Sequence, residues 1–141
     1  MEYRKMGDAW VVRFDRGEEI LTELAALCRK EDIRLASVEA IGAADHAVLG
    51  LYDVEAQAYH QQTFDFPMEI SSLLGTVTRK SGEVYLHLHA TVCGSNLTAR
   101  GGHVNELRVS ATCEMVLRTL PGEVGRVRDP AVGLNVFRFG E

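Results

Sequence analysis

Apolar and polar residues alternate along much of the chain, which is typical of strands that bury one face. The clearest run extends from Val84 to Val92, where alternate residues are apolar, and Leu107 to Leu117 follows the same period. Further β-rich runs, separated by glycines or polar turns, are 9–14, 36–41, 47–52, 58–64, 69–78, 97–100 and 134–139. The pattern therefore predicts a chain dominated by strands.

One segment has a helical period instead. Between Glu18 and Asp32 the apolar residues recur at the spacing of one helix face, namely Ile20, Leu21, Leu24, Ala25, Leu27 and Cys28. Acidic residues begin this segment and basic residues end it, as the helix dipole favours. One early helix followed by mostly antiparallel strands predicts an α+β fold. Because a single helix covers only part of such a sheet, we expect oligomerisation to cover the rest.

Composition narrows the class of protein. A length of 141 residues, with no linker or internal repeat, predicts a single domain over residues 1–141. The net charge of −5 disfavours nonspecific binding of nucleic acid. Residues 1–6 lack the apolar core of a signal peptide, and no apolar run is long enough to span a membrane. With three unpaired cysteines, these features predict a soluble protein of the reducing cytoplasm.

Three of the five histidines fall within seventeen residues, and they form the candidate metal site. His87 and His89 lie on the polar face of the predicted strand 84–92, so both rings point the same way. A turn at 95–96 would return the chain and pair His103 with residue 88. A turn centred one residue earlier gives residue 86, and an odd-length loop or bulge gives 87. Regular pairing with 88 turns His103 away from the other two, but consecutive glycines at 101–102 permit a bulge that re-aims it.

Three neutral imidazoles suit Zn²⁺, with Ni²⁺, Fe²⁺ or Cu²⁺ as alternatives, and they leave one coordination position open. The plainer interpretation is three solvated histidines on a half-exposed strand. Cys93 lies on the same predicted face and is a spare ligand candidate. His46 and His60 have no comparable neighbours, which predicts surface or interface positions.

The chain resembles the plants-and-prokaryotes-conserved (PPC) domain family over residues 11–117. The resemblance is carried, in order, by the segments Gly17–Leu21, Ile41–Ala43, Leu49–Asp53, Glu69–Gly75, Leu86–His89 and Gly101–His103. It implies a compact α+β homotrimer with the histidines near subunit interfaces. Some prokaryotic members resemble zinc proteins that use the histidines corresponding to His87, His89 and His103. Plant members carry DNA-binding AT-hooks, which this chain lacks, so the DNA-binding label of prokaryotic members is a fold-level analogy.

Three functions remain open from the sequence. The first is a metal and small-ligand binding module. A DNA-associated regulator ranks last, because the acidic net charge disfavours it. Between them stands a zinc enzyme acting on a small carboxylic or keto acid, because the family fold resembles that of acetolactate decarboxylase. For that enzyme Glu69 and Glu106 are acid/base candidates, and Arg100 is a candidate for holding an anionic substrate. The plainer interpretations are a strand or interface carboxylate for Glu69, a solvated loop residue for Glu106 and a surface charge for Arg100.

Overall fold

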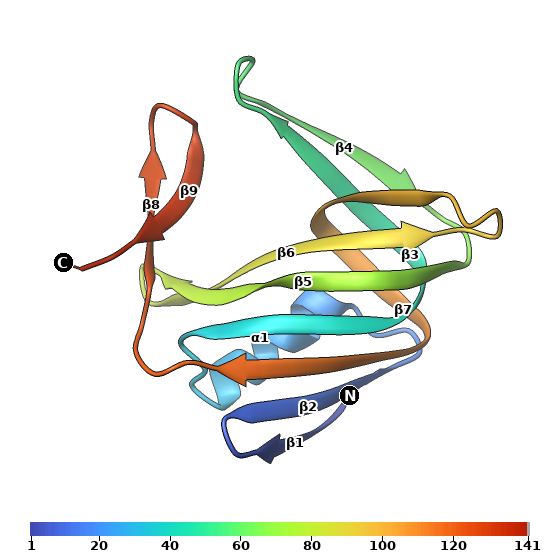
Figure 1. Cartoon of the computed structure of the whole chain (residues 1–141), viewed down its shortest axis with the longest axis horizontal. Coiled ribbons are helices and arrows are strands. Elements are labelled where there is room, and N and C mark those ends of the chain that lie inside the picture. Colours follow the sequence, from blue (N-terminus) through green and yellow to red (C-terminus); the bar gives the residue numbers. More distant parts are fainter. Residues whose placement is uncertain (141) are drawn as a thin grey trace.

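The computed structural model describes residues 1–140, and antiparallel strands dominate it (Figure 1). Seven strands form one sheet in the order β1-β2-β7-β6-β5-β3-β4, and β7 also pairs with β3. The strands are β1 (Glu2–Met6), β2 (Ala9–Asp15), β3 (Ala36–Asp53), β4 (Ala58–Phe64), β5 (Met68–Lys80), β6 (Glu83–Cys93) and β7 (Ala99–Thr119). Because β3, β5, β6 and β7 pair in a closed cycle, the sheet curls back on itself.

The single helix, α1 (Ile20–Lys30), confirms the predicted α+β class, although it is shorter than the predicted 18–32. The Glu19 carboxylate caps it by accepting the backbone N–H groups of Leu21 and Thr22. The same carboxylate accepts the backbone N–H of Leu107 at 3.2 Å. One side chain therefore both starts the helix and fastens it to β7.

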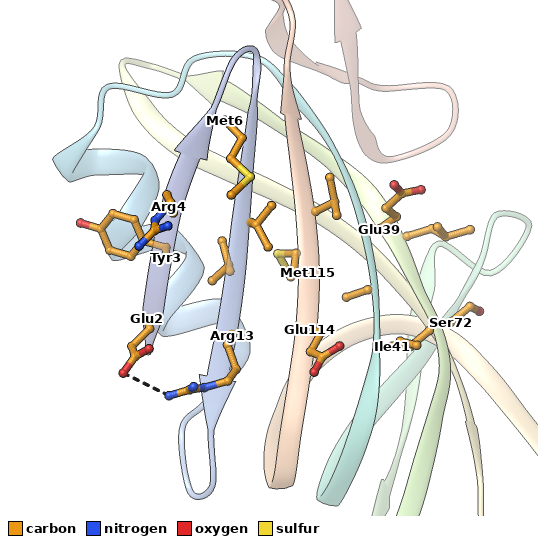
Figure 2. A pocket seen from close by; sticks show the side chains of 15 residues that line it. Glu2, Tyr3, Arg4, Met6, Arg13, Glu39, Ile41, Ser72, Glu114 and Met115 are labelled. Atoms are coloured by element: carbon orange, nitrogen blue, oxygen red, sulfur yellow. Dashed lines mark ion pairs between the residues drawn. The ribbon is translucent and has the colours of Figure 1, made fainter.

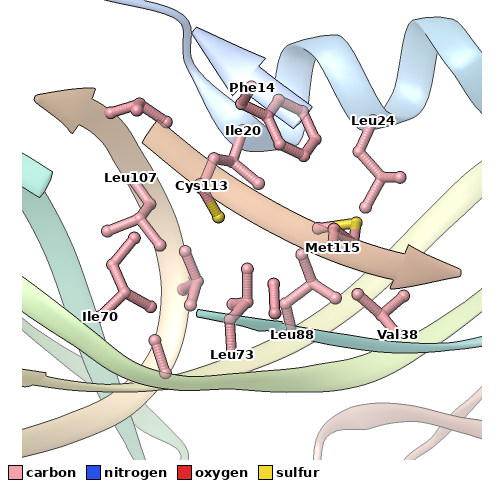
Figure 3. Packing of buried hydrophobic residues seen from close by; sticks show 14 of the residues in the cluster. Phe14, Ile20, Leu24, Val38, Ile70, Leu73, Leu88, Leu107, Cys113 and Met115 are labelled. Atoms are coloured by element: carbon pink, nitrogen blue, oxygen red, sulfur yellow. The ribbon is translucent and has the colours of Figure 1, made fainter. Parts of the chain in front are cut away.

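The core lies between α1 and the inner face of the sheet (Figure 3). Phe14, Leu24 and Leu73 are completely buried there. Cys28 and Cys113 are buried too, and burial raises the pKa of each thiol to about 12. All three cysteines are free, so the core is held together without a disulfide bond.

Two pairs of predicted strands are each one long, bent strand. Segments 36–41 and 47–52 join in β3, which has register shifts between Ala40 and His46. Residues 99–100 of the predicted segment 97–100 join 107–117 in β7, whereas 97–98 lie in the preceding turn. The bulge that the sequence allows at Gly101–Gly102 is absent from the β6–β7 ladder, and these glycines instead allow two backbones to meet. A Cβ atom on Gly102 would lie 2.6 Å from the carbonyl oxygen of Gly50 in β3. Glycine here serves close approach within a sheet, not a turn.

The outer face of the sheet, opposite α1, exposes large apolar side chains around a shallow hollow (Figure 2). Met6 is 54% exposed, Ile41 62% and Leu74 55%. Charges of both signs surround them, including Arg13 from β2 and Glu114 from β7. This face matches the expectation that one helix leaves part of the sheet uncovered.

The last described residues form a separate hairpin of β8 (Gly125–Asp129) and β9 (Leu134–Arg138). It stands beside the turn that joins β5 and β6 (Figure 1). At its tip, Gly133 lies against Tyr52 of β3, since a Cβ on Gly133 would fall 2.3 Å from the Tyr52 hydroxyl. Neither β1 nor β8 was predicted, because both are short and rich in charge. No helix within residues 1–140 has the length and apolar character to cross a membrane.

Candidate metal centre

The three predicted histidines converge because of how β6 pairs with its two neighbours. His87 and His89 lie opposite Thr76 and Leu74 of β5, on the outer face of the sheet. On the other side, His103 of β7 lies directly opposite His89. The predicted partners 86, 87 and 88 are all wrong, because five residues, 94–98, connect Cys93 to Ala99. With that loop the ladder is regular from Ala99 to His103, and no bulge is needed to turn the ring toward the others.

The geometry of the cluster fits a single metal ion. The ring centroids are 5.1 Å apart for His87 and His89, 5.2 Å for His87 and His103, and 5.5 Å for His89 and His103. One nitrogen from each ring lies within 4.8 Å of the others, and the Nε2 atoms of His87 and His89 are 3.2 Å apart. Two nitrogens bound to one tetrahedral zinc are about 3.3 Å apart. The cluster needs only a small contraction to reach that arrangement.

The electrostatics of the cluster also favour metal ligation. Burial, and after it the charges of His87 and His89, lower the pKa of His103 to about 4. Burial likewise lowers the pKa of His87, followed by the charges of His89 and Arg126. At neutral pH both rings are therefore neutral and offer lone pairs, which suits zinc and its neighbours rather than calcium or magnesium. The Cys93 thiol is not part of the group and instead contacts the Ser71 hydroxyl at 3.3 Å.

A tyrosine and an asparagine border the cluster, and no motif or spacing in the sequence singles out either residue. The Tyr59 ring of β4 meets His103 edge to face at 6.1 Å between centroids. Asn105 donates its side-chain N–H to the Tyr59 hydroxyl at 3.0 Å. The ring crosses β3 at Gly50, where any Cβ would fall 2.0 Å from the hydroxyl. Only glycine at position 50 leaves room for Tyr59 to reach this position.

The structure does not bring the other candidate residues to the cluster. Glu69 lies opposite Cys93, four residues along β6 from His89, which is roughly 13 Å of strand. Glu106 accepts a hydrogen bond from His46, and the Arg100 guanidinium lies 5.7 Å above the Phe64 ring. Their roles as acid, base or anion ligand stay predictions.

His46 bridges two carboxylates, one from the segment after β4 and one from β7. Its Nδ1 lies 2.5 Å from Asp65 and its Nε2 3.0 Å from Glu106, and the side chain is 20% exposed. Hydrogen bonding to Asp65, and then to Glu106, raises the pKa of His46 despite partial burial. The His46 ring therefore connects the segment after β4 to β7, and the connection is strongest when the ring is protonated.

We expect His46→Ala to lower the free energy of unfolding by about 1 kcal/mol at pH 6. Because the folded pKa is raised, the bridge contributes fully below the unfolded pKa of about 6.5. The contribution is lost as the pH rises through the folded value. Urea unfolding of both proteins between pH 5.5 and 9 measures this, and a difference that grows toward pH 9 would contradict it.

Comparison with known proteins gives the family. The model of the Plants and Prokaryotes Conserved (PCC, or PPC) domain matches residues 1–121. The chain belongs to the PPC-domain family. The match confirms the resemblance predicted from the sequence and extends past its predicted limits of 11 and 117. No curated protein matches this PPC-domain chain.

Solved structures agree with the assignment. A candidate DNA-binding protein from Bacteroides thetaiotaomicron is 33% identical with a TM-score of 0.95, covering 98% of this chain and 96% of its own. A metal-containing protein from Archaeoglobus fulgidus is 30% identical with a TM-score of 0.89, covering 98% and 97%. A PPC protein from Pyrococcus horikoshii is 25% identical with a TM-score of 0.86, covering 99% and 96%.

A more distant likeness concerns the fold alone. The α-acetolactate decarboxylase of Bacillus subtilis is 13% identical with a TM-score of 0.58. The alignment covers 87% of this chain but only 57% of the decarboxylase. The PPC-domain fold is thus related in architecture to part of that larger protein.

Proposed function

We propose that this PPC-domain protein is a metal-binding module that holds a divalent transition metal, zinc first, through His87, His89 and His103. The observation that carries the proposal is the convergence of three ring nitrogens within 4.8 Å. The donor set fits the group, because all three ligands are nitrogens of imidazoles and two of them have lowered pKa values. The metal-containing relative from Archaeoglobus fulgidus supports the same conclusion.

Titration of metal-free protein with Zn²⁺, followed by calorimetry and elemental analysis, tests the proposal. We expect one equivalent per chain, since the cluster offers ligands for one ion. Competition with Ni²⁺, Fe²⁺ and Cu²⁺ identifies the preferred metal, as geometry alone does not. Protein that takes up no metal would remove the proposal.

The module is proposed to act as a homotrimer, as the family resemblance implies. The exposed apolar residues of the outer sheet face, among them Ile41 and Leu74, support association. His89 lies opposite Leu74, so a subunit seated on this face would lie beside the cluster. Light scattering coupled to size-exclusion chromatography measures the assembly, and a monomer at micromolar concentration would overturn this part.

A zinc enzyme acting on small carboxylic or keto acids is the second candidate. Three protein ligands leave one coordination position free, and a bound metal supplies a Lewis acid that polarises a carbonyl. Tyr59 and Asn105 border the cluster and offer a hydroxyl and an amide for orienting a substrate. Turnover of such acids by zinc-loaded protein, absent in His89→Ala, would establish this activity.

A DNA-associated role is the weaker alternative. It is supported by relatives from Bacteroides thetaiotaomicron and Ralstonia eutropha that are described as candidate DNA-binding proteins. The net charge of −5 opposes it, because DNA binding draws its affinity from phosphate neutralisation. A gel shift at low salt that weakens steeply with added salt would favour this role over the metal-binding one.

A further inference from the structure

Arg126 of the β8–β9 hairpin is a part-buried cation that forms no ion pair with any carboxylate among residues 1–140. Its guanidinium lies between two rings, 4.8 Å from the centroid of Tyr85 and 4.3 Å from that of Phe137. It donates to the hydroxyls of Thr78 and Thr76 at 3.1 and 3.3 Å, and to the carbonyl of Asn135 at 3.2 Å. All three acceptors are neutral.

The order of these contacts gives the direction of the side chain. Nε, nearer the backbone, bonds Thr78, and the terminal Nη2 bonds Thr76. On β6 the residues opposite are Tyr85 for Thr78 and His87 for Thr76. The side chain therefore runs along the strand pair toward the histidines, and its end reaches the level of His87. Directly opposed side chains in a sheet are about 5 Å apart at Cβ.

The Arg126 guanidinium keeps donors free at that end. Arginine carries five N–H groups, and the three hydrogen bonds use three of them. Two N–H groups remain, on a planar group whose geometry matches a carboxylate or a phosphate. Burial also lowers the pKa of Arg126, which reflects the cost of holding this charge away from water.

Among the described residues, no negative charge pairs with Arg126 or with the histidine cluster. Within residues 1–140, no carboxylate forms an ion pair with Arg126, His87, His89 or His103. Glu123 lines the hollow behind Arg126, but its carboxylate pairs with Arg34 at 3.2 Å. A divalent ion on the histidines would raise the local charge to about +3, with no carboxylate of residues 1–140 paired to it. This local positive charge, in a protein whose net charge is −5, favours an anionic ligand.

We propose that the metal centre and Arg126 together bind a small oxyanion, a carboxylate or a phosphate, which places one oxygen at the metal and others at the free N–H groups of Arg126. The proposal rests on the proposed metal centre and names the ligand class of that site. It assigns the anion to Arg126 rather than to Arg100, whose guanidinium lies over the rings of Phe64 and Phe66. The hairpin, outside the matched residues 1–121, thus supplies part of the site.

Protein loaded with Co²⁺ in place of zinc tests the proposal, because the visible spectrum of the ion changes when a ligand enters its coordination shell. Malonate and inorganic phosphate are the two probes, and they distinguish a carboxylate site from a phosphate site. We expect at least one probe to change the spectrum. Arg126→Gln is expected to lower the affinity for that probe at least tenfold. Arg126→Lys is expected to lower the affinity less, because the positive charge remains.

Two variants separate anion binding from its alternatives. Arg138→Gln removes a charge from the same hairpin and from the hollow that Arg126 also lines. Phe137→Ala removes a ring that packs on Arg126 but keeps the guanidinium. We expect both to stay within about threefold of wild type. An equal loss in Arg138→Gln would place the anion in the hollow, and an equal loss in Phe137→Ala would reduce Arg126 to a hairpin anchor, so either overturns the proposal.

Metal affinity, measured in the same variants, distinguishes failure of the metal centre from failure of the oxyanion site. Wild-type protein that binds no Co²⁺ removes the metal centre and the oxyanion site together. Protein that binds Co²⁺ but shows no spectral change with either probe removes the oxyanion site alone. We expect Arg126→Gln to bind Co²⁺ within about threefold of wild type while losing the anion, which is the pattern that only a ligand-contacting role produces.

Discussion

Replacing His89 with alanine is expected to lower the affinity for zinc by roughly 10²–10³-fold, because sites of this kind gain about 10 kcal/mol or more from three or four protein ligands. His89 is the proposed ligand that lies next to both of the others. It lies opposite His103 across β6 and β7, and its Nε2 is 3.2 Å from that of His87. Two remaining imidazoles hold zinc weakly, since two further positions must be filled by solvent. Calorimetric titration with a competing chelator measures the change.

His60→Ala is the matched control for this experiment. His60 is exposed on β4, and it is not part of the histidine group. The control is expected to bind zinc as the unmodified protein does. Equal affinity in His89→Ala and His60→Ala would show that the metal binds elsewhere, and the proposed centre would then be wrong.

Gly102→Ala is expected to destabilise the protein by about 3 kcal/mol and to weaken zinc binding about tenfold. The new methyl group would fall 2.6 Å from the carbonyl oxygen of Gly50 and 3.3 Å from its carbonyl carbon. Both are backbone atoms, so relief requires β3 and β7 to separate. Residue 103, the neighbour in sequence, is the third proposed ligand and would move with β7. Chemical denaturation and zinc titration of the variant measure the two effects.

Gly125→Ala is the corresponding control for added volume at a glycine. A methyl group there meets its first neighbours at 4.0 Å, which is ordinary contact. We expect a change in stability of less than about 0.5 kcal/mol. If Gly102→Ala were equally mild, the close approach of β3 and β7 would not constrain the site.

The sequence predicts the face on which His87 and His89 lie, because the strand period of two is a local property of the chain. It also predicts the helix, whose ends carry the expected charges and whose apolar residues Ile20, Leu24, Leu27 and Cys28 are buried. The family resemblance depends on the order of several short motifs, and the family match confirms it. These features follow from residues close together in sequence.

Register and the surroundings of the site depend instead on contacts between distant segments. The predicted strand partner of His103 is wrong because the turn was expected at 95–96, whereas the connection between β6 and β7 spans residues 94–98. The glycines at 101–102 suggested a bulge, because nothing near them in sequence shows that Gly50 lies against Gly102. Arg126 belongs to no motif, and only the docking of its hairpin brings it beside Tyr85.

The connection between β6 and β7 has a consequence for relatives of this protein. Its odd number of residues sets which way the ring at position 103 points, since a shift of one place along a strand exchanges the two faces of the sheet. A relative with one residue more or less between 94 and 98 could keep all three histidines in its alignment and still present the third to the opposite side. For such proteins, the length of this connection is a better guide to metal binding than the count of histidines.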